Sequence, residues 1–402
     1  MGDGMRPPPP PSPQGGGRVL AEHLQPIPLH ADRGISLVRG EGCYLWDEKG
    51  RRYLDLMTNY GVNLLGHAHP KVNAAIERQA SLLTNAHQSF DTPARQEFLD
   101  TLAGFLPPSL SRISFANSGA EAVEAALKYT RVATGRTGIL ATHRAYHGRT
   151  FGALSTTSDA KYRDPFMPML EGVRHVPFDN LPAMAEAMDD SIAAVIIEPI
   201  QGEGGIRVPT DGYLEGIREL CSAQGALLIC DEIQTGFRTG APLAFNREGI
   251  VPDILCLSKS IANGLPIGVT VVTDAVSERV PKGSHGGTFS GNPLVCAAGV
   301  ATLQVLADER IHSQAAEKGA RFQQRVRELG LSQLREVRGR GLMLAVELKK
   351  PATPVIKAMQ ERGVLVLPGG GTVIRFLPSI LIDDSQLGEG IDALAAAVRQ
   401  VG

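Results

Sequence analysis

The sequence contains few cysteines, and they are scattered along the chain. Their number, five, is odd and none forms a CxxC pair, so neither a disulfide framework nor a structural zinc site is indicated. This usage is typical of a protein from a reducing compartment. Cys221, Cys230 and Cys256 stand among apolar residues, which predicts small core side chains rather than nucleophiles.

Long apolar runs and an excess of basic charge are also missing. No run approaches the ~20 apolar residues that a membrane-spanning helix needs. The 40 Lys and Arg residues nearly balance the 42 Asp and Glu residues, which argues against nucleic acid or an anionic membrane as the main partner. Residues 1–28 are rich in Pro and Gly and lack the apolar centre of a secretory signal. We therefore expect a disordered tail and a cytoplasmic protein.

The chain of 402 residues is long enough for two domains, because one compact unit usually holds about 100–200 residues. With 43% hydrophobic and 20% charged residues, a sizeable core is expected. Short strands are predicted over 29–65 and are expected to pack with a smaller α+β domain at 301–402. Residues 66–300 are expected to form the large domain.

Apolar segments that suit buried strands alternate with helical segments in the large domain. Strands are expected at 113–116, 138–141, 193–197, 226–230 and 254–257. Amphipathic spacing predicts helices between several of them, such as 120–134 and 213–223. This alternation indicates an α/β protein with a mostly parallel sheet covered by helices.

An acidic and a basic side chain each follow one of these strands. Asp231 comes directly after the strand at 226–230, and Lys259 follows the strand at 254–257. Open α/β sheets bind ligands at the carboxyl ends of their strands, so both side chains should meet at one edge. A desolvated lysine can form an imine with an aldehyde, while a carboxylate can keep a pyridine nitrogen protonated. The pair predicts a pyridoxal phosphate site; the alternative, a buried structural ion pair, would stabilise the fold little.

A turn of small residues suits the phosphate of such a cofactor. Ser118, Gly119 and Ala120 join the strand at 113–116 to the following helix, whose N-terminus presents free N–H groups. The alternative is an ordinary capping box formed by Ser118 and Glu121.

Aromatic and basic side chains supply the remaining candidates. Tyr146 and His147 follow the strand at 138–141; Tyr146 is expected to stack on the cofactor ring, and His147 is grouped with it as cofactor-binding. Arg149 and Arg375 are candidates for substrate carboxylates, because guanidinium binds carboxylate through two parallel hydrogen bonds. Either arginine could instead be a surface charge. No ligand pattern completes a metal site, so none is predicted.

Many segments together resemble the class III, fold-type I pyridoxal-phosphate aminotransferases over roughly residues 29–400. The similar segments are GVNLLGHAHP (61–70), ANSGAEAVEAALK (116–128), YHGRT (146–150), EPIQGEGG (198–205), DEIQTG (231–236), SK (258–259), HGGTFSGNP (285–293), VRGRGLM (337–343) and VIRFLP (373–378). Within the family, the chain looks most like the acetylornithine/ornithine branch, including variants whose substrate is attached to an amino-group carrier protein.

The resemblance implies a role for each cofactor-binding candidate. Gly119 and Ala120 would bind the phosphate, and Thr288 would reach the phosphate of the neighbouring subunit, which implies a homodimer with shared active sites. Gln234 would contact the phenolic oxygen of pyridoxal 5'-phosphate, Asp231 its ring nitrogen and Tyr146 its ring face.

The resemblance also implies the substrates. An ω-amino donor such as N-acetylornithine would give its terminal amino group to 2-oxoglutarate, leaving a semialdehyde and glutamate, in arginine or lysine biosynthesis. Arg149 would hold the α-carboxylate of the donor, and Glu203 would cover Arg375 until 2-oxoglutarate arrives.

Alternative substrates and roles remain open at this point. Tyr60 occupies a position where ornithine aminotransferases use a tyrosine near the free α-amino group. Carrier-linked lysine or ornithine, free ornithine and 4-aminobutyrate are therefore alternative donors. A non-enzymatic homologue is disfavoured because Lys259, Asp231 and both arginines are present.

Overall fold

The computed structural model describes residues 26–401, so most of the tail expected at 1–28 lies outside the described residues. The chain from Leu37 onward forms one compact unit. Residues 26–36 belong to a separate unit and contain neither helix nor strand. The domain boundaries after residues 65 and 300 stay predictions.

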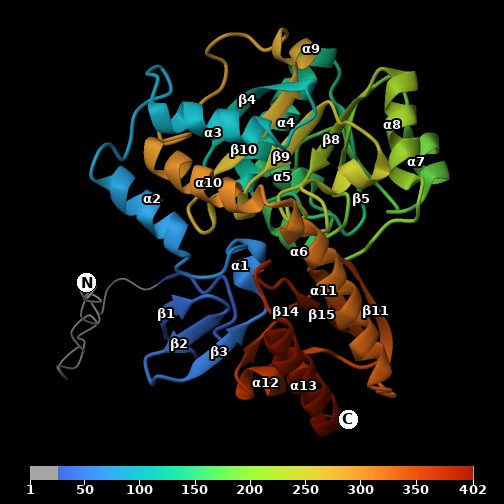
Figure 1. Ribbon diagram of the computed structural model, residues 1–402. Helices are drawn as coiled ribbons and strands as arrows, with labels where there is room; N and C mark the ends of the chain where they lie inside the picture. Colours follow the sequence, from blue (N-terminus) through green and yellow to red (C-terminus); the bar gives the residue numbers. More distant parts are fainter. Residues whose placement is uncertain (1–25, 402) are drawn as a thin grey trace. The chain divides into compact units, whose positions relative to one another are not determined.

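A seven-stranded sheet forms the centre of the part of the chain that carries the site (Figure 1). Its strand order is β4-β10-β9-β8-β7-β5-β6, and only β10 runs antiparallel to its neighbours. The strands are β4 (Leu110–Ala116), β5 (Gly138–Thr142), β6 (Val173–Val176), β7 (Ile192–Ile197), β8 (Leu227–Asp231), β9 (Ile254–Leu257) and β10 (Gly268–Thr273). The sheet is mostly parallel, which confirms the α/β fold expected for a fold-type I transferase.

Successive residues of the central strands are buried on opposite faces of this sheet. On β7, Val195 and Ile197 pack into one apolar cluster, while Ala194 and Ile196 pack into another. Because both faces are covered, the strand reads as a continuous apolar run rather than an alternating one. This is why the strand was predictable from the sequence.

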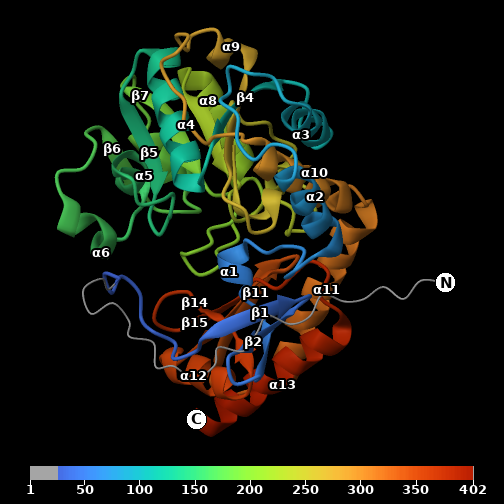
Figure 2. The same ribbon diagram turned by 90° about the vertical axis from the view of Figure 1, so that its left-hand side faces the viewer.

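Helices cover both faces of the sheet. Figure 2 shows α4 on one side and α2, α3 and α10 on the other. The helices of this part of the chain are α2 (Pro70–Ala80), α3 (Pro93–Ala103), α4 (Gly119–Thr134), α5 (Phe151–Thr156), α6 (Ala160–Arg163), α7 (Leu181–Ala187), α8 (Tyr213–Gln224), α9 (Asp274–Ser277) and α10 (Pro293–Leu306). Three 3-10 helices, η1 (Asp164–Phe166), η2 (Ala244–Glu248) and η3 (Lys259–Ala262), lie in the connections. Pro70 and Pro293 stand at first helical positions, where a missing N–H costs no hydrogen bond.

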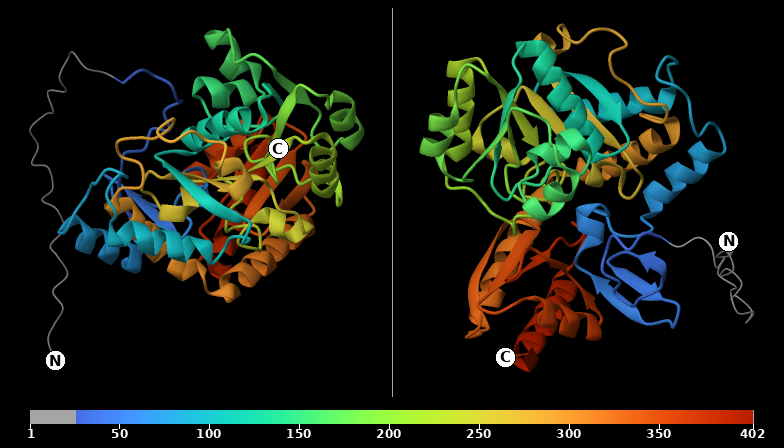
Figure 3. Two further views of the ribbon diagram at one scale, coloured as in Figure 1. Left: turned by 90° about the horizontal axis from the view of Figure 1, so that it is seen from above. Right: turned by 180° about the vertical axis from the view of Figure 1, so that it is seen from behind.

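Two four-stranded sheets bring the beginning and the end of the chain together (Figure 3). In the order β1-β2-β3-β13, the early strand β3 pairs in parallel with the late strand β13. The second sheet has the order β11-β12-β15-β14. These strands are β1 (Leu37–Glu41), β2 (Tyr44–Asp47), β3 (Arg52–Asp55), β11 (Leu334–Arg340), β12 (Met343–Leu348), β13 (Val364–Leu365), β14 (Leu367–Pro368) and β15 (Val373–Phe376). The associated helices are α1 (Thr58–Gly61), α11 (Glu309–Glu328), α12 (Thr353–Glu361) and α13 (Asp384–Val401).

The sequence analysis missed two strands of the large sheet, β6 and β10. β6 has only four residues and contains Arg174 and His175, so it carries no continuous apolar signal. β10 is rich in β-branched residues and mostly apolar, with Thr270 as a buried polar residue, but its antiparallel direction breaks the strand–helix alternation that guided the prediction. All five cysteines are free and buried, which confirms the core positions predicted for Cys221, Cys230 and Cys256. None of the helices in residues 26–401 has the length and apolarity to cross a bilayer.

Candidate active site

Asp231 and Lys259 lie at the same edge of the large sheet, as their positions in the sequence predict. Asp231 is the last residue of β8 and pairs with Cys256 on the parallel strand β9. Lys259 begins η3, directly after β9 and Ser258. The carboxyl ends of two adjacent parallel strands therefore deliver both chemical groups.

Lys259 is held in an uncommon backbone conformation and in a desolvated environment. Its φ of 43° lies in the left-handed region, which lysine seldom adopts and which costs of order 1 kcal/mol or more. Burial disfavours the ammonium ion and lowers the pKa of Lys259, although the negative charges of Glu203, Asp231 and Glu198 act in the opposite direction. The neutral amine, which is the nucleophilic form, is thereby favoured.

Asp231 is fixed by two hydrogen bonds. Its Oδ2 lies 2.7 Å from Nδ1 of His147, and its Oδ1 accepts from the N–H of Ile233 at 3.0 Å. Both Asp231 and His147 are buried. Within residues 26–401, the buried Nε2 of His147 has no hydrogen-bond partner. The pair thus forms a rigid polar group under the candidate cofactor position, and the histidine orients the carboxylate.

In the turn before α4, the capping box that was the alternative to a phosphate site is only half formed, and phosphate binding stays a prediction. Ser118 Oγ accepts from the N–H of Glu121 at 3.2 Å, as in a capping box. The Glu121 carboxylate, however, accepts from the N–H of Asn117 at 2.7 Å rather than from that of Ser118. The N–H groups of Gly119 and Ala120 lie in the first helical turn, where no carbonyl one turn earlier is available within the helix.

Gly119 is required by the close approach of the segment after β8. A Cβ atom at this position would lie 2.9 Å from Cδ1 and Cγ2 of Ile233. Since Ile233 also donates its N–H to the Asp231 carboxylate, the absence of a side chain at Gly119 brings the Ser118–Ala120 turn next to the end of β8.

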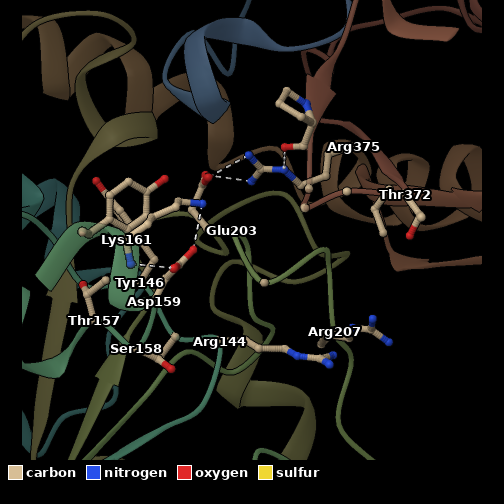
Figure 4. Close-up of a pocket in the computed structure, with 18 of the residues that line it drawn as sticks. Arg144, Tyr146, Thr157, Ser158, Asp159, Lys161, Glu203, Arg207, Thr372 and Arg375 are labelled. Atoms are coloured by element: carbon tan, nitrogen blue, oxygen red, sulfur yellow. Dashed lines mark hydrogen bonds and ion pairs between the residues drawn. The ribbon is translucent and has the colours of Figure 1, made fainter. Parts of the chain in front are cut away.

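A cavity of about 650 Å³ adjoins this sheet edge (Figure 4). Four of the predicted site residues line it: Tyr60, Tyr146, Glu203 and Arg375. Asp231, Lys259 and the Ser118–Ala120 turn are not among its lining residues. Glu203 links the two regions, because its charge acts on Lys259.

Glu203 and Arg375 form a bidentate ion pair in this cavity, as the resemblance predicts. The two oxygens of Glu203 lie 2.8 and 2.9 Å from the two terminal nitrogens of Arg375, and Arg375 Nε donates to the carbonyl of Pro368 at 2.9 Å. The Arg375 side chain is almost fully buried on β15. Burial would raise the pKa of Glu203, but Arg375 outweighs this effect and lowers it below its ordinary value.

Tyr146 and Arg149 lie together with a third residue, Tyr162. The Tyr146 and Tyr162 rings meet edge to face at 5.8 Å, and the Arg149 guanidinium carbon lies 4.5 Å from the Tyr162 ring centroid and 5.9 Å from that of Tyr146. Both rings line the cavity, whereas Arg149 is exposed and is not among the lining residues. Its role as a carboxylate clamp stays a prediction.

Gln234, Tyr60 and Thr288 are the remaining predicted site residues. Gln234 Nε2 donates to the carbonyl of Tyr60 at 3.3 Å, and its buried Oε1 has no partner within residues 26–401. The Tyr60 ring lies 5.9 Å from the Arg375 guanidinium carbon. Thr288 is exposed in the connection between β10 and α10, and its role toward a neighbouring subunit stays a prediction.

Sequence reasoning missed one buried carboxylate that organises the site. Glu198 accepts from the N–H of Tyr146 at 2.9 Å and from the N–H of Gly202 at 2.9 Å. It therefore ties the loop of the aromatic ring to the loop of Glu203. Burial raises the pKa of Glu198 to about 7. Its position directly after the buried strand β7, on the edge that carries Asp231, was the available signal.

The residues at the sheet edge fit a phosphorylated pyridine aldehyde. The unpartnered Nε2 of His147 and Oε1 of Gln234 are buried polar atoms that need a partner. A desolvated amine of lowered pKa, a fixed carboxylate and N–H groups at a helix N-terminus are the three features that such a molecule requires.

Comparison with known proteins agrees with this chemistry. The family described as Aminotransferase class-III matches residues 30–398. LysW-aminoadipate semialdehyde transaminase of Deinococcus radiodurans is 43% identical over 95% of this chain and 89% of the relative. Acetylornithine aminotransferase of Methanothermobacter thermautotrophicus is 41% identical over 91% of this chain and 94% of the relative. A crystal structure of ornithine aminotransferase from Toxoplasma gondii, with partial occupancy of PLP at its active site, superposes with a TM-score of 0.88 at 34% identity, covering 95% of this chain and 92% of that one.

Proposed function

Because the chain belongs to the class III aminotransferases, and to their acetylornithine and LysW-aminoadipate semialdehyde branch, we propose that it transfers the terminal amino group of an acylated ornithine or lysine to 2-oxoglutarate. The products are a semialdehyde and glutamate. The enzyme is an ω-aminotransferase of arginine or lysine biosynthesis, and its cofactor is pyridoxal 5'-phosphate.

The Glu203–Arg375 ion pair is the observation that carries this proposal. 2-Oxoglutarate carries a carboxylate next to its reacting carbon, whereas the ω-amino donor carries none next to its amino-bearing carbon. Amino transfer between them needs one site that accepts both substrates in turn. With Glu203 in place, Arg375 is neutralised and the cavity accepts the terminal CH₂–NH₂ end of the donor. When 2-oxoglutarate binds, its carboxylate replaces that of Glu203 and keeps the same two hydrogen bonds.

The residues at the sheet edge hold and tune the cofactor. When bound, pyridoxal phosphate supplies the electron sink that makes proton removal from the amino-bearing carbon feasible. Asp231, oriented by His147, stabilises positive charge on the ring nitrogen, and the Gly119 and Ala120 N–H groups hold the phosphate. Lys259, whose pKa is lowered, would hold the cofactor through its aldehyde group, and its Nζ, once displaced by the amine of the donor, would accept and return the proton.

The remaining assignments extend this proposal to the donor and the assembly. Arg149 binds the donor α-carboxylate, and Tyr60 lies along the donor chain. Thr288 contacts the phosphate held by a second copy of the chain, so the enzyme works as a homodimer. Its compartment is the cytoplasm. The position of Tyr60 and Tyr146 in the cavity wall supports the donor site. The five free cysteines support the cytoplasmic assignment.

A second candidate donor is an amino acid attached to an amino-group carrier protein. The name of the Deinococcus radiodurans relative refers to a LysW-linked substrate, and the cavity is large enough for an acyl linkage. Free ornithine and 4-aminobutyrate are the further alternatives.

A panel of donors tests the assignment. N-acetylornithine, ornithine, 4-aminobutyrate and carrier-linked lysine are each incubated with the holoenzyme and 2-oxoglutarate, and glutamate is measured. We expect an acylated donor to give a kcat/KM at least tenfold above that of ornithine. Activity with 4-aminobutyrate alone would contradict the biosynthetic assignment.

A further inference from the structure

Two arginines at the outer part of the cavity have no function in the mechanism above. Arg144 and Arg207 both line the 650 Å³ cavity that contains Glu203 and Arg375, and both also line an adjoining cavity of about 460 Å³. Figure 4 shows the two side chains extending from neighbouring segments below the Glu203–Arg375 ion pair. We call these two residues the entrance arginines.

The two guanidinium groups are close enough to repel each other. The pKa of Arg207 lies below its ordinary value, first because it is partly buried and then because Arg338 and Arg144 are nearby. Like charges held together in this way favour the binding of an anion. The Nε atom of Arg207 is buried and has no hydrogen-bond partner in the described part of the chain.

The surrounding carboxylates do not neutralise this positive charge. Glu347 lies 3.5 Å from Arg207, but it makes shorter contacts with Arg338, at 2.6 Å, and with Arg335, at 3.1 Å. Glu336 also pairs with Arg338, at 2.6 Å. Three guanidinium groups thus share two carboxylates, and Arg144 adds a further positive charge beside Arg207.

Three carboxylates line these cavities, and each is already engaged: Glu203 pairs with Arg375. Asp159 lies 2.7 Å from the ammonium group of Lys161. Asp179 accepts from the N–H and the hydroxyl of Thr210, at 2.9 and 2.7 Å. Among residues 26–401, no carboxylate forms an ion pair with Arg144.

The backbone holds Arg144 in a conformation that an unconstrained arginine avoids. Its φ of 67° lies in the left-handed region, which costs of order 1 kcal/mol for a non-glycine residue. The cavity wall also contains Gly369, Gly370 and Gly371, which contribute no side chains. The entrance arginines border the open volume of both cavities.

We propose that Arg144 and Arg207 form a subsite for a carboxylate carried by the acyl group of the amino donor. This inference rests on the proposed function, and it narrows the donor class from any acylated diamino acid to one whose acyl group is itself anionic. The α-carboxylate of the donor is a different group, for which Arg149 is the candidate. A simple acetyl group would leave the subsite empty.

Inert analogues test the subsite without amino transfer. N²-succinyl-norvaline and N²-succinamoyl-norvaline lack the terminal amine and differ only in a carboxylate against a neutral amide of the same shape. Binding to the holoenzyme is measured by calorimetry at low and high salt. We expect the succinyl compound to bind roughly tenfold more tightly, with an advantage that shrinks at high salt.

Three variants assign this advantage to the entrance arginines. The double variant Arg144→Gln/Arg207→Gln should bind both analogues equally, whereas Arg335→Gln, which alters the same cluster away from the cavity, should retain the advantage. The single variant Arg144→Gln should reduce the advantage of the succinyl compound severalfold. It serves as the test if loss of the Arg207–Glu347 contact prevents the double variant from folding. Arg144 is exposed and has no ion pair within residues 26–401, so its replacement should leave the fold intact.

The outcomes separate this inference from the proposed function. Equal affinity of the wild-type enzyme for both analogues, or an advantage that survives in the Arg144→Gln and double variants, would overturn the subsite while leaving amino transfer from N-acetylornithine intact. If the charged analogue binds more tightly through the entrance arginines but no acylated donor reacts, the subsite stands and the proposed function fails.

Discussion

The two ends of the site differ in how their charges are satisfied. At the inner end lie Asp231, His147 and Lys259, which we call the cofactor floor: Asp231 ends β8, Lys259 follows β9 in a strained backbone conformation, and His147 is held against Asp231 by a short hydrogen bond. At the outer end, the entrance arginines lie on loops and have more positive charge than carboxylates around them. Under the proposed function, the cofactor floor would determine the reaction, whereas the loops would determine which substrate enters.

The relatives follow the same division. Proteins about 41–43% identical to this chain share the transaminase reaction but are named for different amino donors. A reaction set by a rigid sheet edge can be kept while loop residues change the substrate.

Replacing the amine of the cofactor floor should have the largest effect. Lys259→Ala removes the group that holds the cofactor aldehyde and carries the proton, so kcat should fall at least ~10³-fold. Lys71→Ala, on α2 and lining a different cavity, is the control and should keep normal activity. Near-normal turnover by Lys259→Ala would contradict the assignment of the reaction to the cofactor floor.

The buried carboxylate beside Asp231 should make stability depend on pH. Burial raises the pKa of Glu232 from 4.5 to about 7, while its oxygens accept from Thr235 Oγ1 and from the N–H of Phe245. Between these pKa values the folded protein binds more protons than the unfolded chain, so the contribution is full below about pH 4.5 and is lost as the pH rises through about 7.

Glu232→Gln should remove this dependence. From pH 5 to pH 8, the free energy of unfolding of the wild-type protein should fall relative to that of the variant by an amount on the order of 3 kcal/mol at most. Denaturant unfolding at both pH values measures it. Parallel pH profiles for the two proteins would show that Glu232 ionises as it does in water.

The carboxylate of the cofactor floor should matter through its charge more than through its shape. Asp231→Asn retains the size of the side chain but cannot stabilise a protonated ring nitrogen, and we expect a fall in kcat of about 10²-fold. Asp253→Asn is a matched control, because Asp253 precedes β9 at the opposite edge of the sheet and pairs with Arg218. Equal losses in the two variants would indicate a structural role only.

The Glu203–Arg375 pair should respond as a selector rather than as catalytic machinery. Glu203→Ala leaves Arg375 open, so KM for 2-oxoglutarate should decrease and KM for the ω-amino donor increase, which shifts their ratio by roughly tenfold. Asp159→Ala, in the same cavity but paired with Lys161, should leave the ratio unchanged. Equal changes in both KM values would contradict the switch.

The cofactor floor could be predicted from the sequence because its residues follow strands that are buried on both faces. Such strands appear as continuous apolar runs, and Asp231 and Lys259 stand where those runs end. The resemblance to a known family then supplied the Glu203–Arg375 pair, whose members are far apart in the sequence and meet only through β15.

Other parts of the site carried no local signal. In the sequence, a loop arginine such as Arg144 cannot be told from a surface charge, because the carboxylates that surround it in the fold are unknown. Glu198 lies in the EPIQGEGG segment, of which only Glu203 was considered as a site residue. The half-formed capping box also depends on tertiary structure, because Glu121 can reach either of two N–H groups. β10 was missed for a topological reason, since its direction is set by pairing with β4 and β9.

Reductive trapping of the cofactor tests the central claim most directly. The holoenzyme is treated with borohydride, digested, and searched by mass spectrometry for a peptide that carries the mass of the reduced cofactor. We expect that mass on Lys259, and its loss from this peptide when an amino donor is added before the borohydride. Attachment to any other lysine, including Lys161 in the neighbouring cavity, or no attachment at all, would contradict it.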